Sequence, residues 1–425
     1  MPWEKRLDNG LLLRTVRDER DMVRFAAFNE EINNRIEGLT CDRLLRNFPG
    51  SVLDNFHLIE DPQTGEVVST TCIIPWRLYF CGVALDVAMP EMVVSRPSHR
   101  KLGLVRIQME RIAQAFVERK ADLAILWGIP NYYRQYGYSY AVEGSVAEAL
   151  HPSRIPKDHS ARGRLKLVPA GEGDIPALEG LYKDLVRPLD VFIQRDAAHW
   201  TYMLRDTKMS VRLVVGVEDG SPRGYLIEAL ESSTGNTYIL ENAITEPEDA
   251  LETLGILGGE CKGELCVKWP QSSSLVRAAQ DLGSTRMLSS QWMFLIPDLP
   301  GLLMRLKPVF DARIADSPYR NNSTELIVNL FREAFRLTIR DGRLSLVEGI
   351  GFRDSSMGAD GGDLLVPRDA LVRLLLGHNS LGELRDAWPD IVVKPGRKRL
   401  VEVLFPRLDA YLYTPYHYSG GTYYG

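Results

Sequence analysis

Apolar and polar positions follow two different periods along the first third of the chain. Met22, Phe25 and Phe28 recur at a spacing of three residues behind an acidic start, which indicates one face of an amphipathic helix. Other apolar runs are short and bounded by Pro, Gly or Asp, as buried strands are. In chain order we predict a strand at 11–14, a helix from about 17, strands at 56–59, 67–75 and 92–94, a helix at 102–119, a strand at 121–127 and a short helix at 131–136. The first block is therefore a mixed α/β unit.

A second block repeats that order of elements. It begins with a strand at 165–168 and a helix opened by the Gly-rich and acidic segment 171–176, and further strands follow on both sides of Gly220. The polar stretch 151–164, with two prolines, reads as a linker between the blocks. The repeat lies in the order of elements more than in residue identity.

A third block starts near Ser317. Alternating strands surround the Asp341-Gly342 pair, a strong hairpin signal because the favoured two-residue turn needs positive φ at both positions. An amphipathic helix is predicted at 368–376. The end of the chain is different in kind, since six of the last fifteen residues are tyrosine; so much apolar area favours docking over a free tail.

Composition narrows the function classes. The chain has 425 residues, 45% hydrophobic and 25% charged, with a formal net charge of −5, which argues against non-specific nucleic-acid binding. No apolar run reaches the roughly 18 residues of a membrane span, and the N-terminal segment lacks a signal-peptide core. Five scattered cysteines suit a reducing compartment, and no His or Cys spacing suggests a metal site. We expect a cytoplasmic protein that binds neither membrane nor nucleic acid and holds no metal.

The segment from Met92 to Arg106 carries the first chemical signal. A strand ends at a proline, a short basic loop follows, and Gly103 lies at the start of the long helix. Free N–H groups in the first turn of a helix form an anion site, and Arg100 and Lys101 add positive charge. A pyrophosphate fits such a site. Taken alone, the same residues also fit an ordinary strand–loop–helix junction with solvated basic side chains.

A second segment, Gly128 to Tyr138, follows the next strand and is rich in tyrosine. Together the two segments resemble the GNAT superfamily of acetyl-CoA-dependent N-acetyltransferases. Arg100, Gly103 and Val105 match its coenzyme signature Arg/Gln-x-x-Gly-x-Gly/Ala. The aromatic signature Tyr-x-x-Phe-Gly-Phe is matched by Tyr133, Tyr136, Gly137 and Tyr138. Val105 departs from the usual small residue, which matters only if its side chain faces the phosphates.

Over its whole length the chain resembles the Eis-type (enhanced intracellular survival) acetyltransferases. That resemblance implies an α/β (α+β) fold with tandem GNAT-like mixed-sheet domains followed by a sterol-carrier-protein-like α+β domain. We accordingly predict a catalytic GNAT domain at 1–150, a degenerate second GNAT-like domain at 151–305, and the sterol-carrier-like domain with an aromatic tail at 306–425. The resemblance also implies acetyl-CoA as co-substrate and a hexameric assembly.

The resemblance and the loop chemistry give one predicted coenzyme site per chain. Its residues are Val93, Val94, Ser95, Arg100, Lys101, Leu102, Gly103, Leu104, Val105 and Arg106. At the matching position of the second block stand the acids Glu246, Glu248 and Asp249, with no glycine. They would repel a phosphate, so we expect no coenzyme there.

Acyl transfer to an amine needs a proton acceptor, donors to the oxyanion and an acid for the sulfur. By its position in the aromatic segment, Tyr133 is predicted as that acid, since a phenol is protonated at neutral pH. In Eis-type proteins the terminal carboxylate is the base, which here implies Gly425; the alternative is a floppy Gly/Tyr tail. Glu30 and Glu31 are predicted to line the amine pocket or else to form an exposed helix end.

The sequence thus predicts an N-acetyltransferase that transfers acetyl from acetyl-CoA directly to a primary amine in a ternary complex. An aminoglycoside, a polyamine or a lysine side chain is the expected type of acceptor. The alternative is a binding protein, with little or no activity, that holds an apolar ligand in its C-terminal domain.

Overall fold

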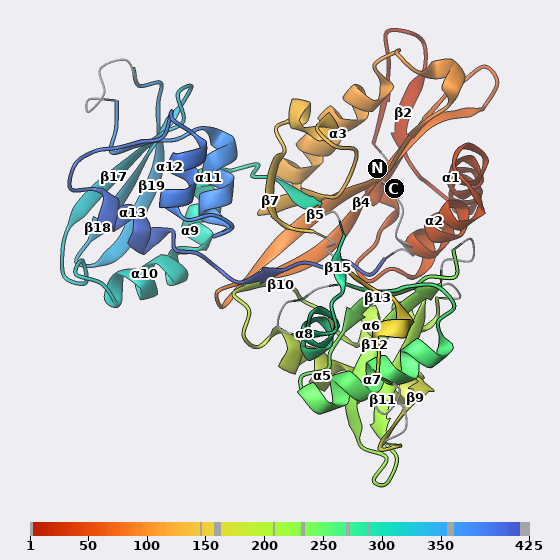
Figure 1. The fold of residues 1–425 in the computed structure, drawn as a ribbon. Coiled ribbons are helices and arrows are strands. Elements are labelled where there is room, and N and C mark those ends of the chain that lie inside the picture. Colours follow the sequence, from red (N-terminus) through yellow and green to blue (C-terminus); the bar gives the residue numbers. More distant parts are fainter. Residues whose placement is uncertain are drawn as a thin grey trace.

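The computed structural model describes residues 3–144, 147–156, 163–206, 209–230, 234–268, 270, 273–287, 290–354 and 361–416. Three sheets organise these residues into three bodies, which we call the first, second and third unit (Figure 1). The first unit is red to orange in Figure 1, the second yellow to green, and the third cyan to blue.

The sheet of the first unit has ten strands, eight of them in one continuous order. These are β1 (Glu4–Arg6), β2 (Leu12–Thr15), β3 (Phe56–Glu60), β4 (Val67–Phe80), β5 (Val83–Ser95), β6 (Leu123–Leu126), β16 (Gln291–Leu295) and β7 (Ser139–Glu143). The long β4–β5 hairpin lies at the centre of this sheet. It is closed by a turn in which Cys81 and Gly82 both have positive φ.

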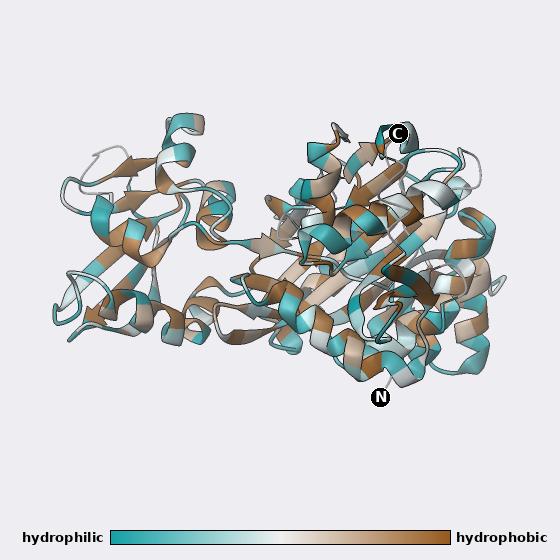
Figure 2. Ribbon diagram, turned by 60° about the horizontal axis from the view of Figure 1, so that its bottom comes forward, coloured by the Kyte–Doolittle hydropathy of each residue, from teal (hydrophilic) through white to brown (hydrophobic). Residues whose placement is uncertain are grey.

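Helices cover both faces of this sheet. On one face α1 (Glu19–Ile32) and α2 (Arg35–Asn47) pack against β4 and β5, and each begins at an Asp or Asn cap whose side chain accepts backbone N–H bonds. On the other face α3 (Leu104–Glu118) packs against the same strands. Helix α1 was predicted from its apolar face, whereas α2, with lower mean hydropathy, was not. Figure 2 shows the hydrophobic residues gathered along the strands.

Three short strands complete the first sheet from distant parts of the chain. Strand β16 lies between β6 and β7, while β10 (Val191–Ile193) pairs with β4 and with β22 (Ala410–Tyr411). Conversely, β8 (Ala147–Leu150) falls within the predicted first domain, 1–150, but pairs with β14 in the second sheet. The units therefore exchange strands, a non-local pairing that hydrophobic period cannot reveal. The three predicted domain ranges stay predictions.

The second unit repeats the layout of the first. Its strands, in spatial order, are β15 (Thr285–Arg286), β8, β14 (Leu265–Lys268), β13 (Thr237–Asn242), β12 (Pro222–Leu230), β11 (Ser210–Gly216) and β9 (Leu165–Pro169). One face is covered by α5 (Ile175–Val186) and α6 (Ala197–Leu204), and the other by α7 (Pro247–Glu260) and α8 (Ser274–Asp281). Strands β13 and β14 run parallel, as β5 and β6 do.

The third unit is a five-stranded sheet with helices packed on it. Its strands, in order, are β19 (Arg343–Gly351), β18 (Ala334–Arg340), β17 (Thr324–Asn329), β20 (Leu364–Leu365) and β21 (Val392–Val393). The helices are α9 (Leu299–Arg305), α10 (Lys307–Ala315), α11 (Arg368–Leu375), α12 (Leu381–Ala387) and α13 (Lys398–Leu404). The predicted Asp341-Gly342 hairpin is present as the β18–β19 turn. After α13 the chain leaves this unit and runs between the other two (Figure 1).

Candidate active site

The first sheet opens between its two parallel strands. Strands β5 and β6 pair only at Val87–Leu123 and Ala88–Ala124. Beyond Ala88, strand β5 continues to Ser95 alongside β4 only, so the edge that faces β6 leaves backbone groups available to a ligand. The sequence suggested that backbone N–H groups of this strand donate hydrogen bonds to the thioester oxygen. The separation of β5 from β6 leaves space for a ligand beside those groups.

A β-bulge lies in the open part of β5. Thr70 pairs with Val94 and Cys72 pairs with Glu91, so a single residue of β4, Thr71, faces both Met92 and Val93. Met92 has a φ of 54°, in the left-handed region, and the Thr70 hydroxyl donates to its carbonyl oxygen at 3.2 Å. The bulge turns the strand locally and changes which face successive side chains take.

The start of α3 forms the other wall of this opening. Gly103 caps the helix with a φ of 75° and without a side-chain hydrogen bond. The first helical bond runs from Ile107 N to Gly103 O at 3.1 Å, so by helix geometry the N–H groups of Leu104, Val105 and Arg106 have no helical acceptor. No atom lies within 4 Å of a Cβ built on Gly103. The first turn is thus open to an anion and suits a pyrophosphate.

The predicted coenzyme residues take two roles in this structure. Arg100, Lys101 and Arg106 are exposed around the loop. Leu104 is buried with the strands β2 and β3, so it offers its backbone and not its side chain. Val105 packs toward the α3 core, and its departure from the family signature therefore leaves the anion site open. The remaining predicted residues, all partly or fully exposed, are Val93, Val94, Ser95, Leu102 and Gly103.

A buried polar cluster joins the two walls. The Ser69 hydroxyl lies 2.7 Å from Ser95 Oγ and donates to Gln108 Oε1 at 2.9 Å, which ties the end of β5 to the second turn of α3. Gln108 is fully buried, and its Nε2 has no hydrogen-bond partner among the described residues. The sequence analysis missed Gln108 because a single glutamine on a helix has no distinguishing pattern.

Tyr133 lies beside the point where β5 and β6 part. It belongs to the short helix η3 (Tyr132–Tyr136) and is 9% exposed, in the same apolar cluster as Ala88, Ala124 and Val93. A Cβ on Gly128 would meet the Tyr133 ring at 2.4 Å, so glycine is required for the ring to lie against this backbone. The structure therefore brings Tyr133 together with β5, β6 and α3, and its predicted role as the acid stays a prediction.

The opposite face of the bulge carries an acid that the sequence analysis missed. The pKa of the Glu91 carboxyl is raised to about 8. Burial is the largest cause and the nearby Glu37 of α2 adds to it, while hydrogen bonds from the Tyr416 hydroxyl and the Met92 N–H oppose it. Glu37 is 6% exposed. The signal in the sequence was a carboxylate in the otherwise largely apolar second half of the strand Val83–Ser95. The two faces of the sheet thus differ: an anion site on the α3 side and an acid on the α1/α2 side.

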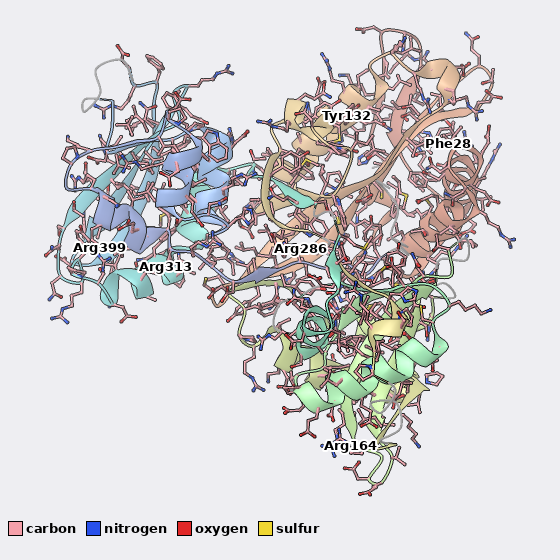
Figure 3. All side chains as sticks on the ribbon, viewed as in Figure 1. Phe28, Tyr132, Arg164, Arg286, Arg313 and Arg399 are labelled. Carbon is pink, nitrogen blue, oxygen red and sulfur yellow. The ribbon has the colours of Figure 1, made fainter. Side chains whose placement is uncertain are left out.

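The other predicted site residues lie elsewhere. The Glu31 carboxylate forms a bidentate pair with Arg96 at 2.6 and 3.0 Å, which holds its pKa below the usual range. Glu30 is exposed at the contact between α1 and α2, over Gly38. Gly425 lies outside the described residues. The roles predicted for these three residues stay predictions. Figure 3 shows Phe28 of α1 and Tyr132 on opposite sides of the first sheet.

The corresponding opening in the second unit is filled. Strands β13 and β14 separate beyond the Ile239–Val267 pair, and there the buried Asn242 accepts a hydrogen bond from Ser273 Oγ. Ser274 donates from its N–H to the Ile244 carbonyl at 3.0 Å and from its hydroxyl to the Thr245 carbonyl. The N-cap and first residue of α8 therefore occupy the place that is open in the first unit.

The helix that matches α3 is also closed to phosphate. Helix α7 begins with Pro247, which has no N–H, and acids follow at once. Arg164 pairs with Glu248, Asp249 and Glu252 at 3.3, 3.8 and 3.1 Å. Figure 3 places Arg164 at the far end of this unit. These contacts support the prediction of one coenzyme site per chain.

Comparison with known proteins agrees with this geometry. Residues 26–141 match the model of the acetyltransferase (GNAT) domain family, a range that holds the bulge, the α3 start and Tyr133. The first unit contains a GNAT acetyltransferase domain. This match confirms the predicted enzyme class, an acetyl-CoA-dependent acyltransferase. Among curated proteins, none matches the chain in sequence.

Solved structures extend the likeness to nearly the whole chain. A GCN5-related N-acetyltransferase from Anabaena variabilis superposes with a TM-score of 0.68 at 15% identity, over 95% of this chain and 99% of that chain. Eis1 from Mycobacterium abscessus gives 0.59 at 14%, over 94% and 98%. N-myristoyltransferase from Saccharomyces cerevisiae, with bound myristoyl-CoA, gives 0.50 at 11%, over 69% and 84%. At these identities the likeness shows the fold, and the predicted mixed α/β fold with GNAT-like units is confirmed at that level. The sterol-carrier-like character of the third unit stays a prediction.

The described residues meet neither the requirements of a metal site nor those of a membrane helix. In the described part of the chain, no group of three or more His, Cys, Asp or Glu residues is placed to hold a metal ion. None of the helices that the structure describes is long and apolar enough to cross a membrane. The predicted cytoplasmic location stays a prediction.

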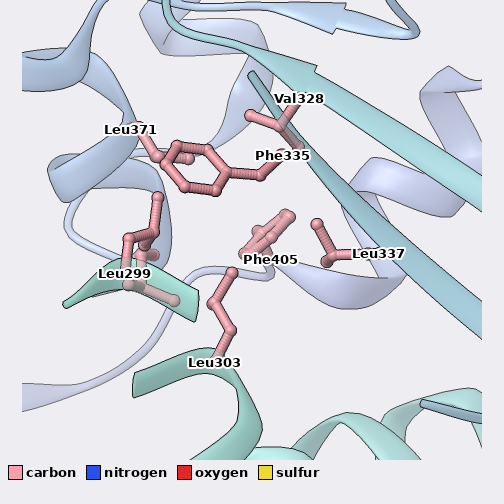
Figure 4. Close-up of a pocket in the computed structure, with 8 residues that line it drawn as sticks. Leu299, Leu303, Val328, Phe335, Leu337, Leu371 and Phe405 are labelled. Carbon is pink, nitrogen blue, oxygen red and sulfur yellow. The ribbon is translucent and has the colours of Figure 1, made fainter. Parts of the chain in front are cut away.

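The third unit contains a small apolar cavity (Figure 4). Its eight lining residues are all hydrophobic: Leu299, Leu303, Val328, Phe335, Leu337, Leu371, Leu375 and Phe405. The cavity volume is about 10 Å³, comparable to the space that one water molecule needs. A lipid-sized ligand does not fit there in this conformation, so the cavity gives no support to the alternative of an apolar-ligand carrier.

Proposed function

We propose that the chain is an N-acetyltransferase that transfers acetyl from acetyl-CoA directly to a primary amine within a ternary complex. The observation that carries this proposal is the two-sided opening beside β5. On one side lie the first-turn N–H groups of α3, which have no helical acceptor, and on the other lies the half-buried acid Glu91. An anionic coenzyme and a cationic amine would thus approach the bulge from opposite faces.

The roles of the chain's own residues follow from this arrangement. The first-turn N–H groups of α3, with Arg100 and Lys101, hold the pyrophosphate. Backbone N–H groups of the bulged segment, beside Val93, donate to the thioester oxygen as negative charge develops there. The coenzyme supplies an activated acetyl group and a thiolate leaving group, and the Tyr133 hydroxyl gives its proton to that sulfur.

Glu91 is the proposed acceptor of the amine's proton. Its pKa of about 8 lies close to a working pH near neutrality, where a general base is most effective. The carboxylate of Gly425 remains the second candidate for this role, on the resemblance to Eis-type proteins. Glu37, behind Glu91, adds negative potential that favours a cationic substrate, in keeping with an aminoglycoside, a polyamine or a lysine side chain.

The test is amine-dependent release of free thiol from acetyl-CoA by the full chain. A panel of diamines, polyamines, aminoglycosides and lysine peptides is assayed, with simple carboxylic acids as the negative set. We expect turnover with at least one cationic amine and an acetylated product of matching mass. Binding of acetyl-CoA without turnover across the whole panel would contradict the proposal.

A further inference from the structure

The segment Asp409–Tyr416 joins the second unit to the acid of the first, and its contacts show how. Its backbone pairs with β10 through the Asp409 carbonyl, which accepts from Asp190 N at 2.8 Å and from Val191 N at 3.1 Å. It then runs between the two units as far as Tyr416, whose hydroxyl binds Glu91. We call residues 409–416 the bridge segment.

Three side chains hold the bridge segment by its carbonyl groups. Trp292 Nε1 donates to the Leu412 carbonyl at 3.2 Å, Arg195 Nη2 to the Tyr413 carbonyl at 3.1 Å, and the Tyr202 hydroxyl to the Tyr416 carbonyl at 2.9 Å. Trp292 and Tyr202 are 2% and 3% exposed. Three buried donors on successive parts of one segment fix its path more firmly than one contact would.

Arg195 is the centre of this arrangement. It lies between β10 and α6 and forms a bidentate ion pair with Glu241 of β13 at 2.5 and 2.8 Å, with both side chains at 0% exposure. Its guanidinium lies 4.3 Å from the centre of the Tyr182 ring and 5.3 Å from that of Tyr413. The charge pair is therefore enclosed by aromatic side chains.

Glu241 holds the other end of the same bridge segment. Its carboxylate accepts from the Tyr225 hydroxyl at 2.6 Å and from the Tyr411 hydroxyl at 3.3 Å. One tyrosine of the segment thus contacts Glu241, and another, five residues later, contacts Glu91. Each glutamate follows the last paired residues of the parallel strands in its own unit.

We propose that Arg195 and Glu241 are positioning residues that fix the bridge segment on the second unit, so that the Tyr416 hydroxyl is held on Glu91 of the first. The degenerate unit thereby acts as the receptor for the bridge segment and sets the reactivity of an acid that it does not contain. This inference rests on the proposed role of Glu91 in the transfer.

The effect on the reaction runs through the Tyr416 hydroxyl. The ionisable groups that face Glu91 in the described structure are Glu37 of α2, Cys72 of β4 and Tyr416, with Cys41 behind Cys72. Tyr416 alone donates from this set to a neighbouring carboxylate, which stabilises the ionised form of Glu91. Loss of the Tyr416 hydroxyl alone would leave Glu91 protonated to a higher pH, and the activity would then rise at a higher pH. Release of the whole segment would also expose Glu91 to water, and because burial is the largest cause of its raised pKa, the activity would then rise at a lower pH.

The test compares three variants of the full chain. R195M/E241M replaces both members of the pair, because removing one alone would leave an uncompensated buried charge. R212M/E228M is the matched control: this bidentate pair, at 2.5 and 2.7 Å, joins two strands of the same sheet, and none of its hydrogen bonds reaches the bridge segment. Tyr416→Phe removes only the hydroxyl on Glu91.

Two readouts decide the outcome. By hydrogen exchange, we expect amides of 409–416 to exchange at least tenfold faster in R195M/E241M and at the wild-type rate in the control. The rising limb of kcat/KM for the amine against pH should move to lower pH in R195M/E241M, where Glu91 loses its burial, and to higher pH in Tyr416→Phe, where it loses only the hydrogen bond. It should not move in the control. The Kd of acetyl-CoA should stay within twofold throughout.

Unchanged exchange in R195M/E241M would overturn the proposal, and so would a shifted pH profile without faster exchange. If that variant does not fold, Tyr411→Phe takes its place; it removes only the phenol on Glu241, and exchange less than threefold faster would contradict the proposal. Hydrogen exchange of the amides of 409–416 reports on the bridge segment and needs no substrate. Absence of turnover in the wild type would therefore contradict the proposed function, while the exchange rates would still test whether Arg195 and Glu241 fix the bridge segment.

Discussion

The first and second units share a layout and differ at the point where their parallel strands part. In the first unit the opening beside β5 is bordered by Gly103 and the free turn of α3. In the second it is filled by Asn242, Ser273 and Ser274. The same layout thus occurs once with the space between the parallel strands open and once with it filled, and a few side chains at the strand ends make the difference.

Glu91 of the first unit and Glu241 of the second unit differ in the same way, because only one of them has a cationic partner in the described part of the chain. Glu241 is fully buried against Arg195, so its charge is neutralised and its task is structural. Glu91 has no cationic partner among the described residues, and burial together with the like charge of Glu37 raises its pKa to about 8. An acid with a guanidinium partner stabilises a structure, whereas an acid beside a like charge is poised to exchange a proton.

The largest expected effect is on coenzyme binding. In Gly103→Val, a β-branched residue must adopt a φ of 75°, at a cost of about 1–2 kcal/mol, and its side chain fills the space that the phosphates need. We expect the Kd of acetyl-CoA to rise at least 100-fold by calorimetry. Glu246→Val, at the matching N-cap of α7, should leave that Kd unchanged; a comparable loss there would contradict the difference between the units.

Loss of the Tyr133 hydroxyl should affect chemistry and not binding. In Tyr133→Phe we expect kcat to fall about 100-fold, the usual scale of one general acid, with the Kd of acetyl-CoA unchanged. Tyr132→Phe, in the same short helix, is the matched control and should keep wild-type kcat. Full activity of the Tyr133 variant would remove this phenol from the mechanism.

Replacement of Glu91 should change both rate and pH dependence. For Glu91→Gln we expect kcat/KM for the amine to fall about 30-fold and to lose the limb that rises through pH 8 in the wild type. Stability is linked to the same group, because its pKa is raised from 4.5 to about 8 on folding. That contribution is complete below pH 4.5 and is lost as pH rises through 8. A denaturant series from pH 5 to 9 should therefore show a smaller decline in the variant, and equal declines would contradict the pKa.

The smallest effect is expected at the closed helix of the second unit. Arg164 pairs with acids of α7, but its side chain is 45% exposed, so solvent screens these pairs. In Arg164→Ala we expect less than 1 kcal/mol of destabilisation by denaturant titration, and no second acetyl-CoA bound. Because the variant leaves those acids without their cation, the second unit should repel a phosphate more strongly, and appearance of a second site would contradict the closed state of that unit.

Local signals in the sequence predicted the elements that depend on local chemistry. The apolar face of α1, the Asp341-Gly342 hairpin and the glycine at the start of α3 are each encoded within a few residues. The coenzyme loop and the position of Tyr133 could be predicted for the same reason. The residues that pack on Tyr133 could not be predicted, since Gly128 and Ala88 contact its ring only in the folded sheet.

Features that depend on distant pairing escaped the sequence analysis. The strands β16 and β22 join the first sheet from more than 140 residues away from their partners on β6 and β10. The pKa of Glu91 is raised mainly by burial and further by Glu37 of α2, against the Tyr416 hydrogen bond, and none of these causes has a local pattern in the sequence. Arg195 likewise looks like an ordinary surface arginine until Glu241 is placed beside it.

The central claim is that acetyl-CoA binds in the opening beside β5 and nowhere else in the chain. A crystal structure of the full chain with acetyl-CoA tests it most directly. The account predicts one coenzyme per chain, with its pyrophosphate on the N–H groups of Leu104 to Arg106 and its sulfur within hydrogen-bond reach of the Tyr133 hydroxyl. A coenzyme bound between β13 and β14, or an empty opening beside β5, would contradict it.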